Sequence, residues 1–195
     1  MCQSFEISII SFIIGIFVAR TLYFRNKPYD KTLAILISFY SFMQLFEAMM
    51  WHSIKTDNIE LNLKATKYAY IILWTHVFAL GYGIYLETKE TFPMLAGIII
   101  FAYGLSKMPI FKKSQPTLTS NGHLVWGFDP SFYTLIFGFA IAIILRYTNL
   151  SYTNIALLFY ILTFIFAYKT NQEAIGSYWC WIAAFFSFIP LILTQ

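Results

Sequence analysis

The sequence predicts an all-α fold, a polytopic transmembrane helix bundle of seven helices. Hydrophobic residues make up 59% of the 195-residue chain and charged residues only 11%, whereas soluble domains average roughly 45–50% and roughly 25%. A soluble core of this size cannot bury so much apolar surface, so a lipid bilayer is the expected solvent. The net charge of +4 does not indicate nucleic acid, because most basic residues lie in the short polar breaks between apolar segments.

The apolar segments are continuous rather than alternating, which favours helices over a transmembrane barrel. Seven segments come close to the roughly 17–25 residues that a hydrocarbon core requires. They span 7–24, 32–54, 66–86, 92–106, 131–147, 153–168 and 178–193. The first segment follows Glu6 and has no basic flank before it, so we expect it to be retained rather than removed as a signal peptide. At this length residues 1–195 are expected to form one domain.

Only one connection is long, the loop 107–130, which contains a Ser-Asn-Gly turn signal. Long connections in compact membrane proteins are often functional, although a plain surface loop is the commoner case. The orientation follows from the first helix, which has Glu6 before it and four basic residues at or after its end. The positive-inside rule then places the N-terminus away from the cytoplasm.

An acidic residue lies inside the second apolar segment. Gln44, Glu47 and Trp51 are spaced i, i+3 and i+7, so they share one face of the predicted helix. A charged side chain near the centre of a membrane helix costs about 2.5–3.5 kcal/mol on insertion scales, so Glu47 requires a partner, water or a proton. His76, expected at similar depth on the next helix, is the predicted partner. Glu47 is either a functional acid in a polar cavity or a protonated acid that hydrogen-bonds neighbouring helices together.

With an odd number of crossings, the few acid, imidazole and thiol side chains are predicted at or toward the membrane face where the N-terminus lies. The second helix ends there, the third and seventh begin there, and the long loop lies there. His52, at the end of the second helix, joins the predicted polar cavity, and His123 and Trp126 are predicted to form a loop lid over it. Each histidine also has a simpler interpretation, as an interfacial or buried ring without a chemical role.

The two cysteines, Cys2 and Cys180, are far apart in sequence but fall on the same predicted face. They could form a disulfide, ligate a metal together with His or Glu, or remain two separate small thiols. No CxxC or HxxxH spacing is present in the sequence, so we expect no metal site.

Three motifs together resemble an uncharacterised family of small multi-pass membrane proteins from large DNA viruses and protists, with distant bacterial relatives. They are the Met-Cys start, Gln-x-x-Glu-x-x-x-Trp at 44–51 in the second helix, and Gly-Ser-x-Trp-Cys at 176–180 near the last. The resemblance covers the whole chain in order. It implies that Cys2, Glu47, Trp51 and Cys180 belong to one site, and it implies no activity.

Better-known classes of seven-helix protein fit less well. A retinal protein needs a lysine in the middle of its last helix, and residues 178–193 contain none, so neither retinal nor another cofactor is expected. The signatures of G-protein-coupled receptors and of PQ-loop sugar transporters are missing, and the histidines do not have the spacing of a membrane hydrolase that binds zinc.

The function favoured by these observations is a transporter or channel for a small solute or ion, with proton coupling through Glu47. One alternative is a membrane-embedded enzyme acting on a lipid or amphiphile near one leaflet. It would use Glu47 with His52 or His76 as the acid/base pair, and Cys2 or Cys180 as nucleophile. The other alternative is a structural envelope protein. The expected partners are membrane lipids and the transported solute, without nucleic acid, and a homo-oligomer remains open.

Overall fold

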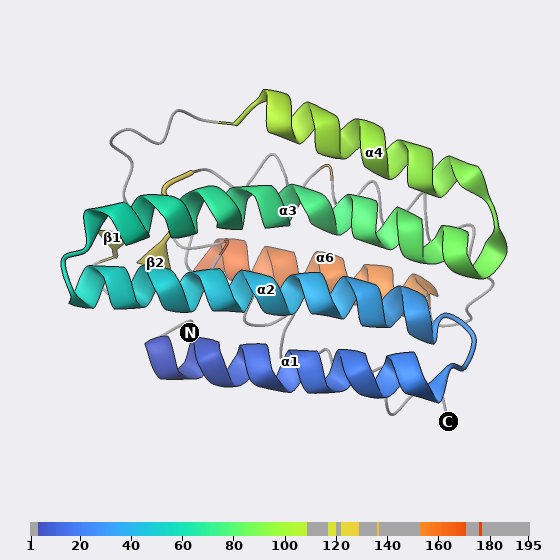
Figure 1. The fold of residues 1–195 in the computed structure, drawn as a ribbon, viewed down its shortest axis with the longest axis horizontal. Helices are drawn as coiled ribbons and strands as arrows, with labels where there is room; N and C mark the ends of the chain where they lie inside the picture. Colours follow the sequence, from blue (N-terminus) through green and yellow to red (C-terminus); the bar gives the residue numbers. More distant parts are fainter. Residues whose placement is uncertain are drawn as a thin grey trace.

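The computed structural model describes residues 4–108, 117–119, 122–128, 136, 153–170 and 176. Within these residues the chain forms five helices and one short hairpin. In chain order they are α1 (Phe5–Arg25), α2 (Asp30–Lys55), α3 (Ile59–Thr88), α4 (Thr91–Ser106), β1 (Thr117–Leu118), β2 (Leu124–Val125) and α6 (Thr153–Thr170). Figure 1 shows α1 to α4 as a row in which each helix packs beside the next one in sequence, with α6 against one face of the row.

This arrangement confirms the predicted helical bundle, and five of the predicted segments coincide with described helices. The predicted helices at 131–147 and 178–193 lie outside the described residues, apart from Ile136, which is helical. Three helices, α1, α2 and α3, are long enough and apolar enough to cross a membrane. A membrane location is supported by these three spans.

Local capping sets where the long helices begin and end. The Ser4 hydroxyl accepts a hydrogen bond from the Ile7 N–H at 3.3 Å and starts α1, and Asn58 caps α3 by accepting from the Leu61 N–H at 3.0 Å. Asn26 and Lys89 adopt left-handed conformations that end α1 and α3. The turns between α1, α2, α3 and α4 are therefore short, which makes neighbouring helices antiparallel.

Helix α3 is longer than the sequence predicts, since it begins at Ile59 rather than at residue 66. Its first two turns alternate apolar residues with Glu60, Asn62 and Lys64, and an exposed ion pair between Lys64 and Glu60, with 2.6 Å between Nζ and Oε1, lies on their surface. Hydropathy finds only the part of a helix that suits lipid, so a polar extension beyond the hydrocarbon is missed. The longer α3 shifts which of its residues face a given residue of α2.

Small residues let the helix backbones approach closely. A Cβ atom added at Gly15 of α1 would lie 2.0 Å from the Ser41 Oγ of α2, and one added at Gly83 of α3 would lie 2.7 Å from the Thr32 Cα of α2. Such contacts are typical of helix association in membranes, where packing rather than water exclusion holds helices together.

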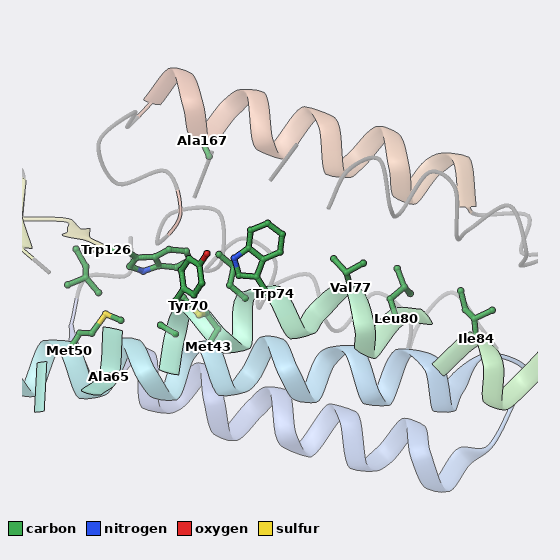
Figure 2. Packing of buried hydrophobic residues seen from close by; sticks show 13 residues of the cluster. Met43, Met50, Ala65, Tyr70, Trp74, Val77, Leu80, Ile84, Trp126 and Ala167 are labelled. Carbon is green, nitrogen blue, oxygen red and sulfur yellow. The ribbon is translucent and has the colours of Figure 1, made fainter. Parts of the chain in front are cut away.

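The buried core follows α3. Its largest cluster joins α2 and α3 to Leu124 and Trp126 of the hairpin segment and to Ala167 of α6. Figure 2 shows these side chains in a line along α3, from Met50 and Trp126 at one end to Ile84 at the other. The outer face of α1 is different, because Ile13 and Phe17 are exposed there, as expected for a surface that contacts lipid.

The long connection contains a β-hairpin where the sequence alone favours a plain loop. Strand β1 pairs antiparallel with β2, with Thr117 opposite Val125 and Leu118 opposite Leu124. The turn between the strands is closed by a hydrogen bond from the Gly122 N–H to the Thr119 carbonyl at 2.9 Å, and Gly122 has a φ of 73°. The Ser-Asn-Gly turn signal is confirmed at Gly122. The hairpin lies at the end of the bundle where α2 ends and α3 begins (Figure 1).

Candidate functional site: a buried acid beneath the hairpin

Glu47 is fully buried on α2, and two neutral N–H groups bind its carboxyl oxygens. Gln44 lies one turn earlier on the same helix face, and its Nε2 donates to Oε2 of Glu47 at 3.0 Å. The indole Nε1 of Trp126, 79 residues further along the chain, donates to Oε1 at 2.9 Å. Glu47 lies eight residues before the end of α2 at Lys55, which is about 12 Å along the helix axis. The acid is therefore well inside the helical bundle.

The hairpin places Trp126 through a series of aromatic contacts. Trp126 packs against Phe128 with ring centroids 5.4 Å apart, and Phe128 meets Tyr70 of α3 edge to face at 5.2 Å. The Tyr70 hydroxyl in turn donates to the Gly104 carbonyl of α4 at 2.8 Å. Trp126 itself is only 6% exposed. The segment after β2 is thus inserted into the bundle rather than lying on its surface.

The register of α2 against α3 explains why there is room for the indole. Phe46 of α2 packs on Tyr68 of α3, with ring centroids 5.6 Å apart. Near this level the inward face of α3 carries Ala65 and Ala69, both fully buried. Two small side chains leave space that a tryptophan fills.

His76 lies at a different level from Glu47. Its ring packs on the Tyr40 ring with centroids 4.3 Å apart, and the imidazole donates a hydrogen bond to the Phe39 carbonyl. Tyr40 and Glu47 are seven residues apart on α2, which corresponds to about 10 Å along the helix. His76 is fully buried, as expected for a mid-helix residue, and its contacts with Tyr40 and Phe39 lie about two turns from the acid.

Trp51 and the next residue, His52, have different surroundings near the end of α2. His52 is exposed, and its ring packs on Phe5 at the start of α1, with centroids 5.9 Å apart. It therefore faces α1 rather than the acid. Trp51 is half-buried, and within the described part of the chain its indole Nε1 is buried without a hydrogen-bond partner.

The hairpin histidine has a mainly structural setting. The His123 N–H donates to the Thr119 hydroxyl at 3.0 Å, and the His123 carbonyl accepts from the Thr119 N–H at 2.8 Å. Partial burial lowers the pKa of the His123 imidazole, which favours its neutral form at pH 7. Of the two residues predicted to form the lid, Trp126 reaches the acid, and His123 holds the turn that carries it.

The predicted thiol site lies outside the described residues, since neither Cys2 nor Cys180 is among them. Their pairing, and the predicted absence of a metal, stay predictions. Where the structure does describe the chain, no three His, Cys, Asp or Glu side chains come together as metal ligands.

Two residues that support the acid were not predicted from the sequence as part of the site. Tyr70 and Phe128 connect Trp126 to the bundle, yet each is one of many aromatic residues in an aromatic-rich chain. The available signal was the pair of alanines at 65 and 69, one just before the third apolar segment and one inside it, because small residues four apart mark a helix face that accepts a bulky neighbour.

The three long apolar helices and the buried carboxyl group are features of a helical membrane protein with an intramembrane acid. Comparison with known proteins adds one distant similarity, to an uncharacterised protein of Acanthamoeba polyphaga mimivirus. The chain is 26% identical to it over 160 residues, which cover 67% of this chain and 66% of that protein. The chain therefore spans just under two thirds of this relative's length.

No protein-family model and no solved structure matches the chain. The similarity to a protein of a large DNA virus agrees with the kind of source predicted from the three sequence motifs. Membership of the family that these motifs resemble stays a prediction.

Proposed function

We propose that this chain is a multi-pass membrane transporter or channel for a small solute or ion, and that Glu47 carries a proton or cation during transport. The observation that carries the proposal is the position of Glu47, which is 0% exposed inside the bundle and bound by Gln44 and Trp126. Acidic residues within membrane helices are costly and usually mark an ion or proton pathway.

The chemistry of the site suits reversible binding of a proton or a cation at Glu47. Both N–H donors favour the ionised carboxylate, while the complete burial of Glu47 opposes it. Gln44 and Trp126 are both uncharged donors, so neither of them becomes an unbalanced buried charge when Glu47 binds a proton or a small cation.

In this proposal Trp126 controls access to Glu47 from one membrane face. It comes from the hairpin, and it covers one oxygen of the carboxyl group. Withdrawal of the hairpin would open Glu47 toward the membrane face where the N-terminus lies. The predicted lid of His123 and Trp126 is kept in this proposal, with Trp126 as the side chain that covers Glu47 and His123 in the turn that carries it.

Seven crossings remain our proposal for the whole chain. Ala167 lies near the end of α6, and Figure 2 places that end on the same side as Trp126. If α4 and α6 both cross the membrane and both end on the hairpin side, the proposal requires an odd number of crossings in the chain between them. This supports the crossing proposed at 131–147, and a last crossing at 178–193 follows from its apolar sequence.

We further propose that the N-terminus lies away from the cytoplasm, on the basis of the basic residues after α1. No cofactor or nucleic acid is part of the proposed mechanism, and a homo-oligomer is compatible with it. The resemblance to the viral and protist family adds the proposal that Cys2 and Cys180 lie close to Glu47 and Trp51.

The proposal is tested by flux in proteoliposomes that enclose a pH-sensitive dye and carry an imposed pH gradient or membrane potential. Wild-type protein should move protons or a proton-coupled ion, and Glu47→Gln should abolish the flux while the helical signal in circular dichroism is unchanged. The matched control is Glu60→Gln, which removes the same charge from an exposed position on α3 and should transport normally.

Equal flux in wild type and Glu47→Gln would end the transport proposal. Hydrolysis of an added lipid or amphiphile by wild type, lost in Glu47→Gln and seen without any flux, would favour the membrane-embedded enzyme instead. If neither activity is detected and Glu47→Gln changes only stability, the structural alternative is favoured.

A further inference from the structure

A groove of about 240 Å³ lies between α1 and α2 on the outer surface of the bundle, away from Glu47. Two small and nearly fully buried side chains, Ala19 of α1 and Ala34 of α2, form its floor. Ile16 and Ile35 give it apolar walls. An apolar groove on the lipid-facing side of a membrane bundle has the chemistry of a site for an acyl chain.

One cationic side chain borders this groove. Arg20 is exposed, and its guanidinium lies over the Phe24 ring at 5.5 Å from the centroid. It makes no ion pair with any residue in the described part of the chain. The next arginine is different, because Arg25 binds the buried Asp30 carboxylate at 2.6 and 2.8 Å. Among the described residues, Arg20 is thus a cation without a neutralising carboxylate.

The depth of Arg20 matches the boundary between acyl chains and headgroups. Helix α1 has 21 residues, about 31 Å, which equals the thickness of a typical hydrocarbon core. Arg20 lies five residues before its end, and an arginine at that depth extends along the helix to reach the phosphate level. Tyr23, also at the groove, adds a hydroxyl at the same end.

The charge around the groove selects the kind of lipid. Residues 20–31 contain four basic side chains and one acidic one, a net charge of +3. A cluster of this sign beside a membrane favours anionic over zwitterionic lipids. We propose that the α1–α2 groove is a binding site for an anionic phospholipid, with one acyl chain between Ile16 and Ile35 and its phosphate on Arg20. This inference needs the membrane location but not transport activity.

Native mass spectrometry of the full chain in detergent tests the headgroup part. The protein is incubated with equal amounts of phosphatidylglycerol and phosphatidylcholine that have identical acyl chains. Wild type should retain mostly phosphatidylglycerol, and Arg20→Gln should lower the ratio of the two adducts about fivefold, the effect of one basic residue at an anionic membrane surface.

The matched control is Lys55→Gln, which removes an exposed cation from the opposite end of α2 and should leave the ratio unchanged. An equal ratio in wild type and Arg20→Gln, or an equal fall in Lys55→Gln, would overturn the proposal in favour of general charge attraction.

The acyl-chain part is tested with a phosphatidylglycerol that carries a photoreactive diazirine in one chain. Cross-links should concentrate on the groove walls, and Ser38→Phe, which fills the groove from α2, should remove them. Labelling spread evenly over the exposed face of α1 would show bulk lipid only and would contradict a specific site.

Discussion

Replacing Trp126 by phenylalanine removes one hydrogen-bond donor from the buried end of the bundle and keeps most of the ring volume. The lost bond joins Nε1 of Trp126 to Oε1 of Glu47 at 2.9 Å, and both side chains are buried. A hydrogen bond to a charged group contributes about 1.5–3 kcal/mol, and one between neutral groups about 0.5–1.5 kcal/mol. We therefore expect Trp126→Phe to destabilise the protein by about 1.5–3 kcal/mol if Glu47 is ionised.

A double-mutant cycle with Glu47→Met isolates this bond, because methionine has similar length and no strong acceptor. The expected coupling energy is about 1.5–3 kcal/mol for an ionised Glu47 and about 0.5–1.5 kcal/mol for a protonated one. The assay is unfolding in mixed micelles by increasing the fraction of dodecyl sulfate, followed by far-ultraviolet circular dichroism. Since independent sites add to within about 0.3–0.5 kcal/mol, a coupling energy below that value would show that the Trp126–Glu47 bond is not formed.

Trp51→Phe is the control for this cycle. It makes the same chemical change on α2, but the Trp51 Nε1 has no hydrogen-bond partner in the described part of the chain. Its coupling to Glu47→Met should lack the hydrogen-bond contribution and be smaller than that of Trp126→Phe.

Three further changes probe the packing, the α1–α2 turn and the edge of the site. Gly104→Ala should destabilise the bundle by about 1–3 kcal/mol, because its Cβ would lie 2.0 Å from the Cδ2 atom of Trp74. Arg25→Gln should cost about 2–4 kcal/mol, since it leaves the fully buried Asp30 carboxylate without its cation. His52→Ala should change stability by less than about 0.5 kcal/mol and leave flux unaffected, because the ring is exposed and faces away from the acid. Micellar unfolding measures all three, with the flux assay added for His52→Ala.

Each of these variants has a matched comparison. Ala102→Val adds volume to the exposed face of α4 and should be tolerated. An equal loss of stability in Ala102→Val and Gly104→Ala would contradict the tight contact between α3 and α4. Lys64→Gln breaks an exposed ion pair with Glu60 and should cost less than about 1 kcal/mol. A similar cost for Lys64→Gln and Arg25→Gln would mean that Asp30 is not buried. Loss of flux in His52→Ala would place that histidine in the pathway after all.

Much of the helical row could be predicted from residue type alone, because lipid imposes length and apolar character on each crossing. The pairing of Gln44 with Glu47 was also predictable, since residues three apart share a helix face. The sequence singled out Trp126 only as part of a loop lid. A contact across 79 residues depends on how the hairpin enters the bundle, and no local pattern encodes that.

The position of His76 depends on the register of α3 against α2, which the hydropathy of the sequence does not determine. Matching the midpoints of the apolar segments 32–54 and 66–86 brings His76 close to Glu47, but α3 begins at Ile59 and its pairing with α2 is shifted by about one turn. Close contacts such as Thr32 with Gly83 fix this register, and they depend on shape rather than hydropathy. The level of Glu47 is therefore occupied by alanines of α3 and by Trp126.

The most direct measurement is pH-difference infrared spectroscopy of the full chain in lipid bilayers, comparing wild type with Glu47→Gln. Wild type should show a protonated-carboxyl band that exchanges with pH, shifts in Trp126→Phe and is missing in Glu47→Gln. A pH-difference carboxyl band that is identical in wild type and Glu47→Gln would show that this acid does not exchange a proton inside the bundle.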